Sequence, residues 1–164
     1  MASPPVHSLE IERKFLLDRV PKLPAYAATW HLEQGYLADG PGRLRRTVKS
    51  SGAVVYTHTV KQGKGIVRRE TERTLSADEF QAIWPRTVGR RLRKTRHLVS
   101  EGDLVWAIDD YDDLELVLAE VELVSVDTPC DPPDWLLPCI VREVTDEPEY
   151  QNYELALRLA GGTD

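Results

Sequence analysis

The chain has 164 residues, of which 41% are hydrophobic and 29% are charged, and its formal net charge is −6. A chain of this size can bury a core of its own, so we expect a single domain over residues 1–164. No run approaches the roughly 18 apolar residues of a membrane-spanning helix, and residues 1–8 lack the apolar core of a signal peptide. We therefore expect a cytoplasmic protein with no membrane partner, in which Cys130 and Cys139 are ordinary thiols.

Charge is distributed unevenly along the chain. Residues 43–96 hold 15 of the 21 lysines and arginines against four acidic residues, whereas residues 97–164 hold two arginines against 18 acidic residues. A basic segment alone would suggest nucleic acid. A basic segment beside an acidic one suggests instead that the two halves meet in the fold, and we expect no nucleic-acid partner. The alternative is a solvated surface held by salt bridges.

The first half of the chain predicts short strands separated by turns. Alternating or β-branched runs place strands at 8–17, 33–38, 43–48, 53–61 and 66–75. The proline-containing segment 20–30 predicts a short helix or an irregular turn. Turn residues at 40–42, 50–52 and 62–65 separate the later strands, which favours an antiparallel meander over βαβ units.

The second half continues this pattern with a few helices. Ser76 and Glu79 form a capping-box pattern that opens a short helix, which Pro85 ends. Strands are predicted at 91–99, 104–111 and 116–126. Residues 131–135 predict a one-turn helix, and residues 150–160 a closing helix.

Charged residues alternate with apolar ones along six of these strands. Glu10, Glu12 and Lys14 share one face of the first strand, while Ile11 points to the other. If the sheet closes into a barrel, one face lines the interior, and an interior lined with charge must be a wet, ligand-filled channel because unpaired buried ions are prohibitive. Acidic and basic groups in similar numbers suit a polyanion complexed with a metal ion.

These motifs together resemble the CYTH-domain family of triphosphate tunnel metalloenzymes, and most closely its compact bacterial inorganic triphosphatases. The resemblance rests on E-x-E-x-K at 10–14, QGYL at 34–37, Arg43 with Arg45, T-x-K ending at Lys61, R-x-E-x-E at 68–72, GRR-x-x-KTR at 89–96, Asp109, E-V-E at 120–122, E-V-T at 143–145 and N-x-x-L-A at 152–156.

The resemblance implies a mainly β fold, a closed eight-stranded antiparallel β-barrel with a few short helices, that hydrolyses tripolyphosphate to pyrophosphate and phosphate with Mg²⁺ or Mn²⁺. A homodimer fits the family. By position, the metal ligands would be Glu10, Glu12, Asp109, Glu120 and Glu122. The substrate would be bound by Lys14, Arg43, Arg45, Lys61, Arg68, Lys94 and Arg96, with Glu70 and Glu72 lining the lumen. Lys94 would also be the candidate catalytic residue, assisting the water or the leaving group, although phosphate binding explains it equally well.

Two positions depart from the family's pattern, and several functions stay open. Relatives often carry an acidic residue where this chain has Ala107 and a lysine where it has Tyr153. These departures bear on one metal position and on one phosphate contact. The alternative functions are an adenylate cyclase, a thiamine or nucleoside triphosphatase, and a non-catalytic polyphosphate binder.

Overall fold

Strands are the main secondary structure of the computed structural model, which describes residues 4–63 and 66–161. Within those residues the strands are β1 Val6–Leu17, β2 Ala28–Tyr36, β3 Arg43–Val48, β4 Val54–Gln62, β5 Val67–Leu75, β6 Arg91–Glu101, β7 Leu104–Tyr111, β8 Val117–Glu122 and β9 Ile140–Glu143. The helices are α1 Ala77–Ile83 and α2 Asn152–Ala160, with 3₁₀ turns η1 Trp84–Thr87, η2 Leu137–Cys139 and η3 Pro148–Tyr150.

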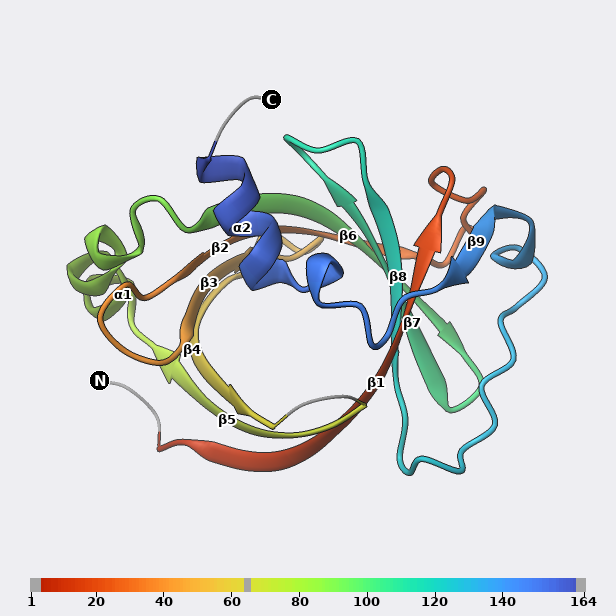
Figure 1. Cartoon of the computed structure of the whole chain (residues 1–164), viewed down its shortest axis with the longest axis horizontal. Helices are drawn as coiled ribbons and strands as arrows, with labels where there is room; N and C mark the ends of the chain where they lie inside the picture. The colour runs from red at the N-terminus through yellow and green to blue at the C-terminus, as the bar shows by residue number, and fades with distance from the viewer. Residues whose placement is uncertain (1–3, 64–65, 162–164) are drawn as a thin grey trace.

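Eight of these strands form an antiparallel ring. The hydrogen-bonded order is β5-β4-β3-β2-β6-β7-β8-β1, and a further pairing of β1 with β5 closes it (Figure 1). The predicted eight-stranded barrel is therefore confirmed. The ninth strand, β9, was not predicted, and it pairs with β1 at Phe15–Leu17 outside the ring.

Strand β1 holds the ring together by changing partner halfway along. Its residues Val6–Ile11 pair with β5, and its residues Glu12–Leu17 pair with β8. The second half of β1 therefore has β8 on one edge and β9 on the other. The change of partner falls between Ile11 and Glu12, inside the E-x-E-x-K motif.

Local interactions explain both predicted ends of α1. The Ser76 hydroxyl accepts a hydrogen bond from the Glu79 backbone N–H at 3.1 Å, and α1 gives way to η1 at Trp84, just before Pro85. The predicted closing helix is confirmed as α2. Residues 20–27 contain no helix, so that segment takes the irregular alternative and β2 begins at Ala28.

One predicted helix does not form, strands β2 and β8 differ most from their predicted bounds, and one turn lies partly outside the described residues. Strand β2 begins at Ala28 rather than at 33. No helix forms at 131–135: the Pro133 carbonyl instead accepts bonds from the N–H groups of Leu136 and Leu137, which leads into η2. Strand β8 ends at Glu122 rather than at 126, because the Leu123 N–H makes its last ladder bond, to Ile11. Of the predicted turn at 62–65, residues 64 and 65 lie outside the described residues.

The outward face of the barrel is covered, which explains the apolar residues that lie between charged ones. Leu44 and Leu75 pack with Phe80 of α1. On the opposite side, Trp106 and Val121 belong to a cluster that also holds Phe15, Leu17, Ile108, Ala119, Leu123, Leu136 and Cys139. The segment after β8 therefore shields the outside of β1, β7 and β8.

One end of the barrel interior is apolar. Leu92, Tyr111 and Leu118 project inward there and pack with Leu155 and Ala156 of α2. Figure 1 shows α2 lying across the opening of the ring. The helix closes this end of the barrel, and the remainder of the interior stays polar.

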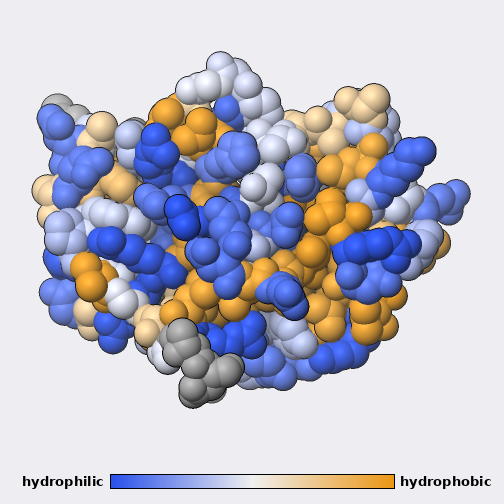
Figure 2. Space-filling view, turned by 90° about the horizontal axis from the view of Figure 1, so that it is seen from above, coloured by the Kyte–Doolittle hydropathy of each residue, from blue (hydrophilic) through white to orange (hydrophobic). Residues whose placement is uncertain are grey.

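The surface mixes hydrophilic and hydrophobic residues. Exposed hydrophobic residues include Val124, Val126, Leu137 and Val141, all in the segment that follows β8. Seen from above, hydrophobic residues gather mainly in the right-hand half of the molecule (Figure 2). None of the described helices has the length and apolar character needed to cross a membrane.

Candidate active site

The inward faces of the strands enclose a cavity of about 720 Å³. Twelve of the fourteen residues predicted from the sequence line it: Glu10, Glu12, Lys14, Arg43, Arg45, Lys61, Arg68, Glu70, Glu72, Arg96, Glu120 and Glu122. The other two, Lys94 and Asp109, have no exposed side-chain surface and lie beneath the cavity wall. The structure thus gathers in one place residues that are up to 112 positions apart in the sequence.

Strand register explains how the charged residues meet. Glu12 lies directly opposite Glu122, and Lys14 directly opposite Glu120, on the paired strands β1 and β8. Directly opposite residues in an antiparallel pair point to the same face with Cβ atoms about 4.5–5.5 Å apart. The pairing therefore places three carboxylates and one ammonium side by side on one wall.

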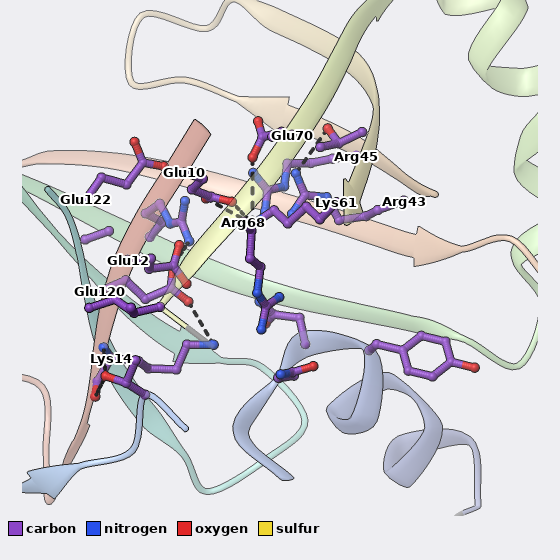
Figure 3. A pocket seen from close by; sticks show the side chains of 18 of the residues that line it. Glu10, Glu12, Lys14, Arg43, Arg45, Lys61, Arg68, Glu70, Glu120 and Glu122 are labelled. Carbon is purple, nitrogen blue, oxygen red and sulfur yellow. Dashed lines mark hydrogen bonds and ion pairs between the residues drawn. The ribbon is translucent and has the colours of Figure 1, made fainter. Parts of the chain in front are cut away.

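The acidic wall contains a group of carboxylates suited to a divalent cation. One carboxylate oxygen from each of Glu10, Glu12 and Glu122 lies within 4.8 Å of the other two. Figure 3 shows these residues on one side of the cavity and Arg43 and Arg45 on the other, while Lys61 contacts Glu10 at 3.0 Å. Hard oxygen ligands converging at this spacing are what Mg²⁺ and Mn²⁺ require.

Proton affinity in this wall reflects crowding of like charges. Burial, and then the charge of Glu120, raises the pKa of Glu12 to about 7. Burial and Glu10 likewise raise the pKa of Glu122. Burial alone would raise the pKa of Glu10 as well, but the Lys61 ammonium, 3.0 Å from its carboxylate, lowers that pKa to about 2. A divalent cation would oppose this crowding and favour the charged forms of Glu12 and Glu122.

Two arginines of the cationic wall, Arg43 and Arg45, are held by neutral partners. Arg45 donates two hydrogen bonds to the Gln34 side-chain oxygen, at 3.1 and 3.0 Å, and Arg43 donates one to the Thr59 hydroxyl at 3.3 Å. The buried Nε of Arg43 has no hydrogen-bond partner among the described residues. Burial, and then the charges of Arg43 and Arg96, lowers the pKa of Arg45 to about 9. These guanidinium groups therefore lie where an anion would be strongly stabilised.

A buried ionic network supports the wall from below. Asp109 accepts two bonds from Arg96, at 2.7 and 2.8 Å, and one from Lys94 at 2.8 Å. Arg96 in turn reaches Glu120 at 3.3 Å. Burial lowers the pKa of Lys94 to about 7, outweighing the opposite effect of Asp109. Both oxygens of Asp109 are thus engaged within the wall, and Arg96 connects that network to the cavity.

Sequence reasoning missed several residues that hold this arrangement. Asn152, the first residue of α2, accepts bonds from Lys94 at 3.2 Å and from the Tyr111 hydroxyl at 2.6 Å. Gln34 orients Arg45, and Thr59 donates to Glu72 at 2.9 Å while accepting from Arg43. Gln34, Thr59 and Asn152 all occur within the motifs already recognised, so their positions could have been found. A neutral side chain, however, gives no indication in the sequence of the charged residue that it binds.

The two departures from the family's pattern also line the cavity. Ala107 is only 8% exposed and lies directly opposite Glu120. Tyr153 is 41% exposed and packs edge-on against Tyr36, with ring centroids 5.3 Å apart. An alanine and an aromatic ring therefore occupy two places on the cavity wall where charge was expected.

A closed eight-stranded barrel that encloses facing acidic and basic walls defines the triphosphate-tunnel class of fold. No family model matches the chain. The chain is 34% identical over 156 residues to the inorganic triphosphatase of Nitrosomonas europaea, an alignment that covers 92% of this chain and 98% of that protein. It therefore belongs to the CYTH-domain family of triphosphate tunnel metalloenzymes.

Solved structures agree with this assignment. The crystal structure of the inorganic triphosphatase NE1496 is 32% identical, covers 90% of this chain and 94% of its own, and has a TM-score of 0.60. The PH1819 protein of Pyrococcus horikoshii is 18% identical, covers 72% of this chain and 80% of its own, and has a TM-score of 0.53. The second likeness shows the fold alone.

Proposed function

We propose that the protein is a metal-dependent inorganic triphosphatase that hydrolyses tripolyphosphate to pyrophosphate and phosphate in the barrel cavity. The observation that carries this proposal is the arrangement of the two walls, with converging carboxylates facing converging guanidinium groups across one cavity. The inorganic triphosphatase relative supports it, because that alignment spans nearly the whole of both chains.

The cationic wall would bind the phosphate chain. Arg43, Arg45 and Arg68 offer planar guanidinium groups, which pair with phosphate oxygens through two hydrogen bonds. Lys14 and Lys61 add ammonium groups from the neighbouring strands. In the absence of an anion the charges of Arg43 and Arg96 help to lower the pKa of Arg45, so tripolyphosphate would relieve an existing repulsion.

The acidic wall would hold Mg²⁺ or Mn²⁺ through Glu10, Glu12 and Glu122. When bound, the ion supplies charge neutralisation on the phosphate oxygens and polarises the phosphorus centre. Glu120 lies 3.4 Å from Lys14 and 3.3 Å from Arg96, so we assign it to orienting these cations next to the metal ligands. We assign Asp109, which binds only Lys94 and Arg96 among the described residues, to positioning Arg96.

Hydrolysis needs an oriented water molecule and a proton acceptor. The water oxygen attacks a terminal phosphorus, the bridging P–O bond breaks, and pyrophosphate leaves together with the electron pair of that bond. Glu70 is suited to accept the proton of the water, because burial and the neighbouring Glu10 raise its pKa to about 7. Lys94 has no surface in the cavity, so we infer that it acts through Asp109 and Asn152 rather than on the substrate.

Assembly and location belong to the same proposal. The family resemblance implies a homodimer, and we propose a cytoplasmic location. Sedimentation of the purified protein tests the first, with a mass near 37 kDa expected for two chains of 18.6 kDa each.

Phosphate release from tripolyphosphate tests the function directly. Protein stripped of metal should be inactive in EDTA, and Mg²⁺ or Mn²⁺ should restore turnover. Ca²⁺ should inhibit, since its larger and looser coordination would misplace the water. Undiminished turnover in EDTA would contradict the metal dependence. Inactivity with every divalent ion would contradict the triphosphatase activity.

A matched pair of variants separates metal binding from substrate binding. Glu122→Gln keeps the size of the side chain but removes the charge, and turnover should fall by about 100-fold or more. Tripolyphosphate affinity should fall much less, and excess Mn²⁺ should restore part of the turnover. The control is Glu115→Gln, an exposed residue in the β7–β8 turn. Equal turnover in the two variants at low metal would contradict the assignment of the acidic wall.

A further inference from the structure

The ladder of charged residues on β6 and β7 stops abruptly. Lys94 and Arg96 point inward on β6, and the next residue in phase is Leu98. On β7 the residues in phase with Asp109 are Ala107 and Val105. Leu98 pairs directly with Ala107, so Leu98, Val105 and Ala107 form one continuous apolar facet on the cavity wall.

This facet bounds the cationic wall on one side. Among the described residues that line the cavity, the lysines and arginines are Lys14, Arg43, Arg45, Lys61, Arg68 and Arg96. Beyond the facet, Asp103 in the β6–β7 turn also lines the cavity and adds a negative charge.

The other side of the cationic wall is bounded as well. Tyr36, Val144, Asn152 and Tyr153 line the cavity where α2 closes the barrel. None of these side chains carries a positive charge. The cations thus form a band between the closed end and the apolar facet.

We propose that the apolar facet limits the length of the phosphate chain that the cavity accepts, which makes Leu98 and Val105 specificity-determining residues. This inference rests on the proposed triphosphatase function. Because α2 closes one end of the barrel, we infer that a phosphate added to tripolyphosphate lies against the facet. There it would lose water to hydrocarbon and approach the carboxylates of Asp103 and Glu122 without gaining a cation. A site that leaves a charge unpaired discriminates strongly against the ligand that carries it.

The test compares tripolyphosphate with tetrapolyphosphate in three variants. Val105 is 48% exposed, so Val105→Lys places an ammonium on the facet without disturbing a packed core. Val54→Lys is the matched control, since Val54 is 40% exposed and lies outside the cavity lining. Val105→Leu keeps the facet apolar.

The readout is the ratio of kcat/KM for tetrapolyphosphate to that for tripolyphosphate. We expect the wild-type ratio to be below about 0.1, and Val105→Lys to raise it by about tenfold, the effect of one added charge-assisted contact. Val54→Lys and Val105→Leu should leave the ratio at the wild-type value. Far-ultraviolet circular dichroism establishes that each variant is folded.

Two results would overturn the inference while leaving the triphosphatase intact. One is a wild-type enzyme that hydrolyses both chains equally well, and the other is a folded Val105→Lys variant with an unchanged ratio. If the wild type does not hydrolyse tripolyphosphate, the proposed function has failed. The same comparison is then made on dissociation constants by calorimetry, and an unchanged ratio of constants in Val105→Lys still overturns the facet's role.

Discussion

Replacing Glu12 by Gln should stabilise the metal-free protein at alkaline pH while destroying its metal site. Glu12 lies close to Glu10 and Glu122, and its pKa is raised from 4.5 to about 7 by burial and by Glu120. A carboxyl whose pKa is raised on folding contributes stability that is fully present below its unfolded pKa. That stability is lost as the pH rises through the folded pKa.

The size of the effect follows from the pKa. A change from 4.5 to about 7 corresponds to about 3 kcal/mol, since each pKa unit is about 1.36 kcal/mol. Water in the cavity screens the neighbouring charges, so we expect about 1 to 2 kcal/mol of this between pH 5 and pH 8. Glu70 titrates in the same window but is present in both proteins, so its effect cancels in the comparison.

Urea unfolding in EDTA measures this difference. Trp106 is 1% exposed and packs on Phe15, which makes its fluorescence a reporter of unfolding. The free energy of unfolding of Glu12→Gln, minus that of the wild type, should increase by about 1 to 2 kcal/mol from pH 5 to pH 8. A difference that stays constant, or that shrinks as the pH rises, would refute the reasoning. Glu115→Gln should show no such trend.

Three further predictions test the walls and the covering core. Arg68→Ala should weaken tripolyphosphate binding by about tenfold, whereas Arg69→Ala, on the exposed outer face of β5, should not, and calorimetry distinguishes them. Tripolyphosphate should raise the melting temperature, with about 1.4 kcal/mol for each tenfold excess over Kd, and no shift at millimolar ligand would count against the cavity as its site. Phe80→Ala should lower the free energy of unfolding by about 3 to 5 kcal/mol and leave KM nearly unchanged, because Phe80 of α1 is 2% exposed in the outer core and does not line the cavity.

The barrel was predictable because its strands alternate strongly. Residues 43–48 and 104–111 were predicted as strands with the bounds that β3 and β7 have. In both strands, successive residues alternate between the outer face and the face toward the cavity. This alternation alone accounts for the whole pattern. Strand β9 escaped prediction since it has only four residues, three of them exposed, and its pairing with β1 is decided by distant packing.

The candidate site was predictable as a set but not in depth. Alternation places Lys94 and Asp109 in the same phase as Arg96 and Glu120, and sequence offers no measure of where along the barrel the interior closes. That depth depends on α2, whose Asn152 binds Lys94, and on the packing of Leu118 beneath it. Consequently the alternation along each strand identifies which residues point inward. The packing of α2 at one end of the barrel decides which of them reach the cavity.

The change of partner along β1 has a consequence for how the protein folds. The ring cannot close until β1 has joined both β5 and β8, and the second of these pairings brings together residues that are 110 positions apart, as with Glu12 and Glu122. Contacts of such long range are formed late and slowly, because the entropy of closing the loop must be met first. The same closure brings Glu122 to Glu10 and Glu12, so the cluster of three carboxylates is assembled only in the last step. An ion that binds these carboxylates would stabilise the closed barrel, and it would slow the opening of the barrel more than it speeds its formation.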